Sequence, residues 1–269
     1  MSTILKLNER QPITPTTEGF WFRAETPLQF RPGQFLRWNL PHDQPDERGT
    51  SRFFSIASAP TEPAILLATK FNAEGSSFKR RLSAMQPGET VEATGPLGGF
   101  ILPDDPARPV VLVAGGIGVT PFRSMLKMMA DSNRQTPTHL LYGSRTASEL
   151  AFKTDLDQWA SSLPNLAITY VVAQPDPEWP GQTGNLDAQR ILDLTSLPTS
   201  TVLGDTEGGL PPRRSGARTA GHRRWQDPRL LIYLSGPQPM IEALKHGLLE
   251  LGVAEEQIKT DYFPGYTEL

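Results

Sequence analysis

The sequence contains no cysteine among its 269 residues. This absence excludes disulfide bonds, zinc–thiolate sites and cysteine-ligated iron–sulfur clusters within the chain. Histidine is also scarce, because only positions 42, 139, 222 and 246 carry it, and their spacing is not that of metal ligands. We therefore expect no metal site.

Long hydrophobic runs and a large excess of charge are missing as well. No apolar run reaches the roughly 18 residues that indicate a membrane span, and the N-terminal stretch MSTILKLNERQ lacks the hydrophobic region of a signal peptide. The net charge of −3 gives no overall basic footprint for nucleic acid. We expect a cytoplasmic protein of one to two domains that neither spans a membrane nor binds nucleic acid.

The chain up to residue 103 has the pattern of an antiparallel β-barrel or sandwich. Short apolar runs alternate with turn residues such as Arg31-Pro32-Gly33. One helix is expected at 76–83, where a serine can cap it and Phe78 with Leu82 forms an i,i+4 apolar pair. The expected strands are 4–7, 19–24, 34–40, 53–57, 65–70 and 90–94.

After a proline-containing linker at 104–109, strands and helices alternate, which is typical of a doubly wound, mostly parallel sheet. The expected strands are 110–114, 139–142, 167–172, 230–234 and 258–263, and the expected helices are 120–131, 148–161, 186–193 and 237–251. Residues 197–229 do not fit, because they are rich in Pro, Gly, Thr and Arg. Their composition favours a solvated, disordered insertion. The alternative is a contact with an acidic partner or a nucleic acid.

A glycine-rich turn follows the first strand of this second part. Gly115, Gly116 and Gly118 precede Thr120-Pro121, and proline is favoured in the first turn of a helix. A turn without Cβ atoms lets a ligand approach backbone N–H groups, and a helix N-terminus favours a phosphate. The alternative is a tight strand-to-helix turn that binds nothing, since the spacing is not the G-x-G-x-x-G fingerprint.

Two stretches of the β region combine groups that suit a nucleotide. Arg52 and Ser55 bracket Phe54, so one strand offers a guanidinium for a phosphate, a ring that can stack and a hydroxyl. Further along, Lys70 and Gly75-Ser76-Ser77 supply a cation and a helix N-terminus with hydroxyls. Each stretch alone is also explained by an edge-strand arginine or a capped helix.

Taken in order, these motifs resemble those of the ferredoxin–NADP reductase-like family of flavoproteins. The matching stretches are 52–55 for R-x-Y-S, 75–77 for the pyrophosphate turn, 95–100 for G-P-x-G-x-F, 115–121 for G-G-x-G-x-T-P, 235–240 for C-G-P-x-x-M and 261–263 for E-x-F. The resemblance covers almost the whole chain apart from 197–229. It implies a flavin-binding β-barrel at 1–103 and an NAD(P)-binding α/β domain at 110–269.

The resemblance implies hydride transfer from NAD(P)H to bound FAD, which passes electrons to a separate acceptor, either a protein or a small molecule. The catalytic candidates that it implies are Ser55, Thr120, Ser235 and Asp261. The residues that it assigns to cofactor binding are Arg52, Phe53, Phe54, Ser55, Lys70, Gly75, Ser76, Ser77, Gly115, Gly116, Gly118, Thr120, Pro121, Ser144, Arg145, Ser235, Gly236, Pro237, Met240 and Phe263.

Particular roles follow for some of these residues. Arg52 and Ser77 are expected at the flavin phosphates, and Phe54 is expected to stack near the flavin ring. Phe263 or Tyr266 is expected to cover the flavin, with simple core packing as the alternative.

Three positions depart from the family pattern, because Phe54 replaces Tyr, Ser235 replaces Cys and Asp261 replaces Glu. They keep open a flavin-binding electron-transfer subunit or a redox-sensing module with little turnover of its own. A further alternative is a partner-binding protein whose arginine-rich 197–229 segment is the active surface.

The choice of nucleotide depends on charge. Asp176 follows strand 167–172, and an acidic residue there disfavours a 2′-phosphate and favours NADH. Ser144-Arg145 follows strand 139–142 and suits the phosphate of NADPH instead. Of the two, the sequence favours NADH.

Overall fold

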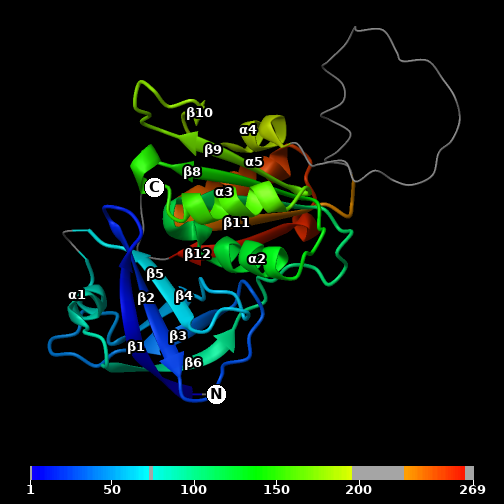
Figure 1. Cartoon of the computed structure of the whole chain (residues 1–269). Helices are drawn as coiled ribbons and strands as arrows, with labels where there is room; N and C mark the ends of the chain where they lie inside the picture. The colour runs from blue at the N-terminus through cyan, green and yellow to red at the C-terminus, as the bar shows by residue number, and fades with distance from the viewer. Residues whose placement is uncertain (1, 73–74, 196–226, 264–269) are drawn as a thin grey trace, which may run out of the picture.

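The computed structural model describes residues 2–72, 75–195 and 227–263, which form two sheets lying next to each other (Figure 1). Sheet A is antiparallel, with strand order β4-β3-β6-β1-β2-β5. Its strands are β1 (Ser2–Pro12), β2 (Thr17–Ala24), β3 (Phe35–Asn39), β4 (Ser51–Ser55), β5 (Ile65–Lys70) and β6 (Thr90–Leu97). The sheet curves around a core that contains Phe20, Phe22 and Trp38. Helix α1 (Ser77–Ala84) packs on that core through Phe78 and Leu82.

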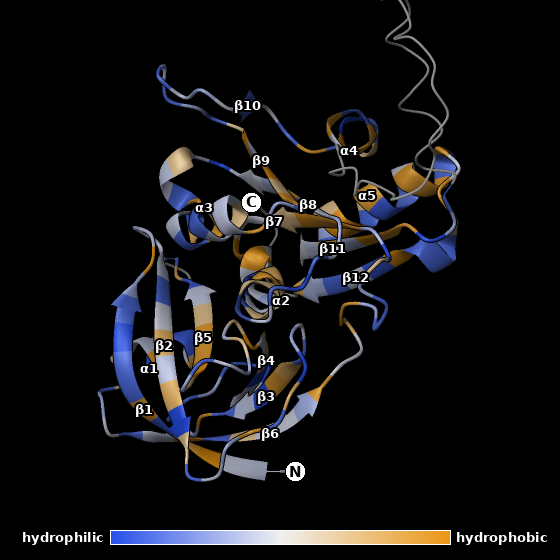
Figure 2. Cartoon of the chain, turned by 45° about the vertical axis from the view of Figure 1, so that its right-hand side comes forward, coloured by the Kyte–Doolittle hydropathy of each residue, from blue (hydrophilic) through white to orange (hydrophobic). Residues whose placement is uncertain are grey.

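Sheet B is parallel, with strand order β10-β9-β8-β7-β11-β12. Its strands are β7 (Val110–Gly115), β8 (Thr138–Ser144), β9 (Leu166–Val172), β10 (Gln182–Thr183), β11 (Leu231–Pro237) and β12 (Ile258–Phe263). Strands buried on both faces are almost continuously apolar, and β8 and β11 carry such hydrophobic stretches (Figure 2). The strand order reverses between β7 and β11. In open α/β sheets such a reversal marks the ligand-binding crevice.

Helices cover both faces of sheet B. One face is covered by α2 (Thr120–Asp131) and α3 (Lys153–Ser162), and the other by α4 (Ala188–Leu194) and α5 (Gln238–Glu250). Short 3₁₀ turns complete the set as η1 (Gly116–Val119), η2 (Ala147–Glu149) and η3 (Glu255–Gln257). Helix α2 faces sheet A (Figures 1 and 2), where Ile117 of η1 packs with Ala57, Leu66 and Ala68.

This architecture confirms the predicted fold class of an antiparallel barrel-like sheet followed by a doubly wound parallel sheet. The predicted helix 148–161 is wrong in its first turn. Residues 147–149 form the separate turn η2, and Phe152 has a left-handed backbone with φ of 61° before α3 begins at Lys153. Strand β4 lies two residues earlier than predicted, because Ile56 and Ala57 bond to Gln34 and Leu66 outside the ladder. The short strand β10 was not predicted.

Most of the arginine-rich segment, residues 197–226, lies outside the described residues, so its predicted disorder stays a prediction. Among the described residues, no helix has the length and apolar character needed to cross a membrane. No cluster of potential metal ligands occurs among them either.

Candidate functional site

The two sheets share a pocket, here called the interdomain pocket, with a volume of about 330 Å³. It lies at the carboxyl ends of β4, β5 and β12 and beside η1. The residues that line it are Phe35, Arg48, Arg52, Phe53, Phe54, Ser55, Ala68, Thr69, Asn72, Gly75, Ser76, Lys79, Ile117, Thr120, Asp261, Tyr262 and Phe263. Nine of the predicted site residues are therefore brought together here: Arg52, Phe53, Phe54, Ser55, Gly75, Ser76, Thr120, Asp261 and Phe263.

One end of the interdomain pocket is polar. The Ser55 hydroxyl at the end of β4 donates to Oδ2 of Asp261 on β12 at 3.2 Å. Burial raises the pKa of the Asp261 carboxyl to about 7, and the Ser55 hydrogen bond acts in the opposite direction. A carboxyl with such a pKa can hold a proton or release it near neutral pH. Thr120 lines the same pocket, but its hydroxyl donates to the Ile117 carbonyl at 3.1 Å.

Ser235 lies beside Asp261, because these residues are register partners in the parallel pair β11–β12. Its side chain is fully buried, and its hydroxyl has no hydrogen-bond partner among the described residues. A buried hydroxyl without a partner costs free energy, which is consistent with a group that a ligand completes.

The glycines in the turn after β7 allow close packing against the turn after β11 as well as the approach of a ligand. A Cβ on Gly118 would lie 2.2 Å from the Ser235 carbonyl oxygen, and a Cβ on Gly236 would lie 3.1 Å from the Gly115 carbonyl oxygen. The turns that end β7 and β11 therefore contact each other backbone to backbone. Gly116 has φ of 53°, which favours glycine. None of these glycines lines the interdomain pocket.

The other end of the interdomain pocket is cationic. Arg48, Lys79 and Arg52 line it together with Gly75 and Ser76 at the N-terminus of α1. Burial, together with the nearby Arg48 and Lys70 charges, lowers the pKa of Lys79 to about 8. Like charges gathered at a helix N-terminus form a site that an anion stabilises. The sequence reasoning missed Arg48 and Lys79, because neither lies in a recognised motif.

The structure gives Arg52 and Ser77 a different role from the predicted phosphate contacts. Nη2 of Arg52 donates to Oδ1 of Asp46 at 2.6 Å, and Nη1 points to the carbonyls of Arg48, Gly49 and Ser51 at 2.8–3.0 Å. Ser77 exchanges two hydrogen bonds of 2.9 Å with Asp46 and does not line the interdomain pocket. Both residues therefore hold the 46–49 loop, which presents Arg48. Direct phosphate contact by either one stays a prediction.

The charge state of Asp46 fits this supporting role. Burial opposes its ionisation, but hydrogen bonds from Arg52 and Ser77 outweigh that effect, so the pKa of Asp46 lies well below its usual value. Asp46 is thus a carboxylate at neutral pH and keeps the Arg52 guanidinium in place.

Aromatic rings also line the interdomain pocket. Phe53 is 61% exposed and meets Phe35 edge-on at 5.7 Å between centroids. The ring centroid of Phe54 lies 5.7 Å from that of Phe78, and Phe54 lines the pocket. Phe263 also lines it, beside the exposed Tyr262. These rings offer faces and edges to a planar ligand. Tyr266, the alternative cover, lies outside the described residues.

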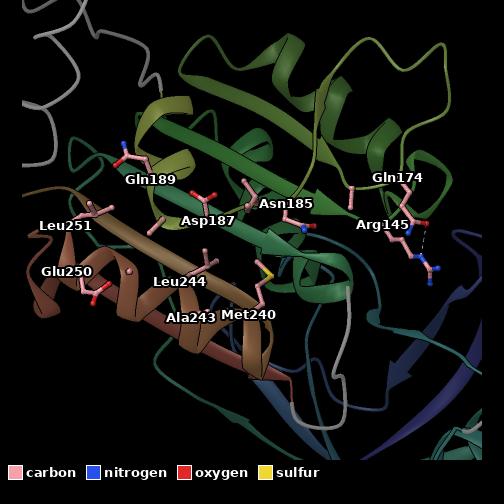
Figure 3. Close-up of a pocket in the computed structure, with 14 residues that line it drawn as sticks. Arg145, Gln174, Asn185, Asp187, Gln189, Met240, Ala243, Leu244, Glu250 and Leu251 are labelled. Atoms are coloured by element: carbon pink, nitrogen blue, oxygen red, sulfur yellow. Dashed lines mark hydrogen bonds between the residues drawn. The ribbon is translucent and has the colours of Figure 1, made fainter.

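A second pocket, here called the outer pocket, opens between α4, α5 and the carboxyl ends of β8 and β9, with a volume of about 810 Å³ (Figure 3). Arg145 and Met240 are the predicted site residues that line it. Nε of Arg145 donates to Oε1 of Gln174 at 3.2 Å. Asp187 and Glu250 also line it, whereas Asp176, on which the NADH argument was based, does not. Asp187 accepts a 2.7 Å bond from the Arg190 N–H and caps α4.

The remaining predicted site residues line neither pocket; they are Lys70, Ser77, Gly115, Gly116, Gly118, Pro121, Ser144, Ser235, Gly236 and Pro237. Lys70 forms a 3.3 Å ion pair with Glu149, across the two sheets. Pro121 lies in the first turn of α2, and Ser144 is buried at the end of β8. The structure therefore uses several motif residues to shape the site rather than to line it.

Comparison with known proteins agrees with this geometry. The model of the oxidoreductase NAD-binding domain family matches residues 112–246. The anthranilate 1,2-dioxygenase electron transfer component of Acinetobacter baylyi is 28% identical over 88% of this chain. The toluate 1,2-dioxygenase electron transfer component of Pseudomonas putida is 28% identical over 84%. The chain spans 59% and 56% of the lengths of these two relatives.

Among solved structures, the cytochrome P450 reductase GcoB of Amycolatopsis superposes with a TM-score of 0.76 at 21% identity, covering 98% of this chain and 70% of that one. This likeness shows that the two proteins share the fold in which an antiparallel barrel-like sheet is followed by a parallel sheet. The chain belongs to the oxidoreductase NAD-binding domain family.

Proposed function

We propose that the protein is an FAD-dependent NAD(P)H oxidoreductase that serves as the reductase component for a separate electron acceptor. The observation that carries this proposal is the interdomain pocket itself. It brings together the cations of Arg48 and Lys79, the Ser55–Asp261 hydrogen bond and the rings of Phe53, Phe54 and Phe263. A dinucleotide with a planar ring can use all three features, because cations hold its phosphates, aromatic rings contact the planar ring and a polar pair hydrogen-bonds to its edge.

The residues present fit a flavin nucleotide. Lys79, Arg48 and the N-terminus of α1 at Ser76 would hold the phosphates, because cations and a helix N-terminus favour anions. Phe54 would contact the ring system, and Ser55 would offer its hydroxyl at the ring edge. A bound flavin supplies the exchange between two-electron and one-electron chemistry that the side chains lack.

The chain's own residues then bind, orient and handle protons. Asp261 holds a proton near neutral pH, and Ser55 fixes the orientation of its carboxyl. The buried Ser235 hydroxyl lies next to Asp261 on the neighbouring strand, where it would receive a hydrogen bond from a nicotinamide amide. Tyr262 and Phe263 border the pocket and exclude water from its polar end.

We infer that the nucleotide extends from this region into the outer pocket, and that NADH is preferred. Met240 lies at the start of α5, between the β11 turn and the outer pocket. Asp187 and Glu250 line the outer pocket, and Arg145 is its cation. Two carboxylates disfavour a 2′-phosphate more than one exposed guanidinium favours it. Asp176, which the sequence suggested for this role, does not line the outer pocket.

We propose an oxygenase-type protein as the electron acceptor, since the two relatives named above are dioxygenase electron transfer components. This sequence cannot itself hold a cysteine-ligated iron–sulfur cluster as the accepting centre, because it has no cysteine.

The experiment is a visible absorption spectrum of the purified protein after incubation with FAD, followed by anaerobic addition of NADH and, separately, NADPH. The expected result is a flavin spectrum that bleaches rapidly, and faster with NADH. A flavin that binds but does not bleach would replace this proposal with an electron-transfer subunit or redox sensor. Failure to bind FAD or FMN would refute it.

A further inference from the structure

A buried arginine crosses from sheet B to sheet A. Arg123 lies in α2, and only 5% of it is exposed. Its Nη1 donates to Oε2 of Glu62 at 2.9 Å and its Nη2 donates to Oε1 at 3.1 Å, so the ion pair is bidentate. Nη1 also lies 2.9 Å from the Ala57 carbonyl oxygen. Glu62 and Ala57 lie in the segment between β4 and β5, so all three contacts join the two halves of the chain.

Aromatic rings enclose the same guanidinium. Its Cζ lies 5.0 Å from the Phe152 ring centroid, 5.6 Å from that of Trp159 and 5.7 Å from that of Trp21. Asp155 adds a longer contact of 3.5 Å. Trp21 comes from β2 and the other three come from the η2–α3 region. Cation–π and charge contacts in a desolvated site hold a planar guanidinium in one orientation.

On both sides, the contacts lie two to three residues along the chain from residues that line the interdomain pocket. Arg123 follows Thr120 by three residues in α2, and Ala57 follows Ser55 by two. Next to Arg123, the Ser124 hydroxyl donates to the Ser58 carbonyl at 2.6 Å. The segment after β4, a strand that lines the pocket in sheet A, is therefore hydrogen-bonded to helix α2, whose first residue lines the pocket from the sheet B side.

Stability alone does not explain this arrangement. A buried ion pair contributes little net stability compared with apolar residues of similar volume. Its bidentate geometry, however, fixes the orientation of Arg123 relative to Glu62, which apolar packing does not. Reactions between two held groups are sensitive to displacements of about 1 Å.

We propose that Arg123 is a positioning residue that sets the alignment of the two pocket walls, and so the approach of nicotinamide to flavin. This proposal rests on the oxidoreductase function proposed above. Glu62 is its principal partner, and the aromatic rings of Trp21, Phe152 and Trp159 restrict its orientation. The role is indirect, because Arg123 does not line the interdomain pocket.

The test compares Arg123→Gln with Arg10→Gln. Arg10 is a matched control, because it pairs bidentately with Glu18 at 2.8 and 3.0 Å, contacts the Met85 carbonyl and lies over the Phe20 ring at 5.5 Å, all within sheet A and its loops. The FAD-loaded variants are mixed anaerobically with saturating NADH. We expect Arg123→Gln to slow flavin reduction at least tenfold and to weaken the long-wavelength charge-transfer absorbance, with FAD affinity within threefold of wild type. Arg10→Gln is expected to leave both unchanged.

Arg123→Lys keeps the positive charge but loses the planar guanidinium that pairs bidentately with Glu62. We therefore expect partial rescue of the rate of flavin reduction. A second readout is independent of activity. The chain has no cysteine, so single cysteines at the exposed Lys6 and Gln158 can carry spin labels that report the distance between the sheets. We expect the distance distribution to broaden in Arg123→Gln and not in Arg10→Gln.

The two readouts separate the possible failures. An unchanged distance distribution in folded Arg123→Gln would overturn the positioning role, whatever the rate. A broadened distribution with an unchanged reduction rate would overturn its link to hydride transfer. If the wild-type flavin is not reduced by either nucleotide, the proposed function fails, and the distance measurement still decides whether Arg123 aligns the sheets.

Discussion

The Ser55 hydroxyl donates to the Asp261 carboxylate at 3.2 Å, although the two residues are 206 positions apart in the chain. The bond joins the end of an antiparallel strand in sheet A to a parallel strand in sheet B. The pKa of the Asp261 carboxyl therefore depends on the contact between the two sheets. Several predictions about pH and charge rest on this geometry.

The first prediction concerns Asp261. Its pKa of about 7 predicts an inflection near pH 7 in the rate of NADH oxidation with ferricyanide as acceptor. Asp261→Asn should abolish that inflection. Because the Ser55 hydrogen bond lowers the pKa, Ser55→Ala should move the inflection to higher pH. A profile that is the same in all three proteins would contradict the assignment.

Asp261 also links folding to pH. Its folded-state pKa lies above the ordinary value, so the folded protein binds this proton more tightly than the unfolded chain. The resulting stability is complete below about pH 4 and is lost as pH rises to about 7. In urea unfolding, the free energy of unfolding should fall less between pH 4 and pH 7 for Asp261→Asn than for the wild type.

A further prediction concerns Lys79. Its pKa of about 8 would rise when an anion binds, so the dissociation constant for FAD should increase as pH rises above 8. Lys79→Met should weaken FAD binding at pH 7 by roughly tenfold or more, the value of a charge-assisted contact, and should remove the pH dependence. Arg81→Met is the control on the same helix, because Arg81 pairs with Glu89 away from the pocket. Equal effects of both changes, measured by flavin fluorescence titration, would argue against a specific contact.

Gly118 provides a prediction about packing. An added Cβ would lie 2.2 Å from the Ser235 carbonyl oxygen, and backbone atoms cannot rotate away as side chains do. We expect Gly118→Ala to lower the free energy of unfolding by about 1–3 kcal/mol or more. Gly99→Ala, whose Cβ would meet nothing within 4 Å, should change it by less than about 0.5 kcal/mol. Similar urea midpoints for the two variants would show that the β7 and β11 turns can separate.

Arg145 tests the choice of nucleotide. It is the cation that lines the outer pocket, and NADPH differs from NADH by a phosphate. Arg145→Gln should raise KM for NADPH by roughly tenfold, the value of one ion-paired hydrogen bond, and leave KM for NADH within about threefold. An equal increase for both nucleotides would mean that Arg145 contacts a part they share.

Much of the local structure was predictable, because its signals are local. The apolar run before Gly115, the Pro121 position and the spacing after it predicted β7 and α2, and the helix has the expected bounds of Thr120–Asp131. The start of α3 was not predictable in this way. Phe152 adopts a left-handed backbone that nothing in its neighbours' residue types requires.

By itself, the sequence determined the two kinds of sheet, the absence of thiol chemistry and the order of the nucleotide motifs, since composition and spacing act over a few residues. Only the tertiary structure decided which charges face the pocket. Arg48 and Lys79 line the cationic end beside Arg52, which pairs with Asp46, and Arg123 crosses to Glu62. The physical reason is that burial and long-range pairing depend on how the two sheets pack, which spacing along one chain does not specify.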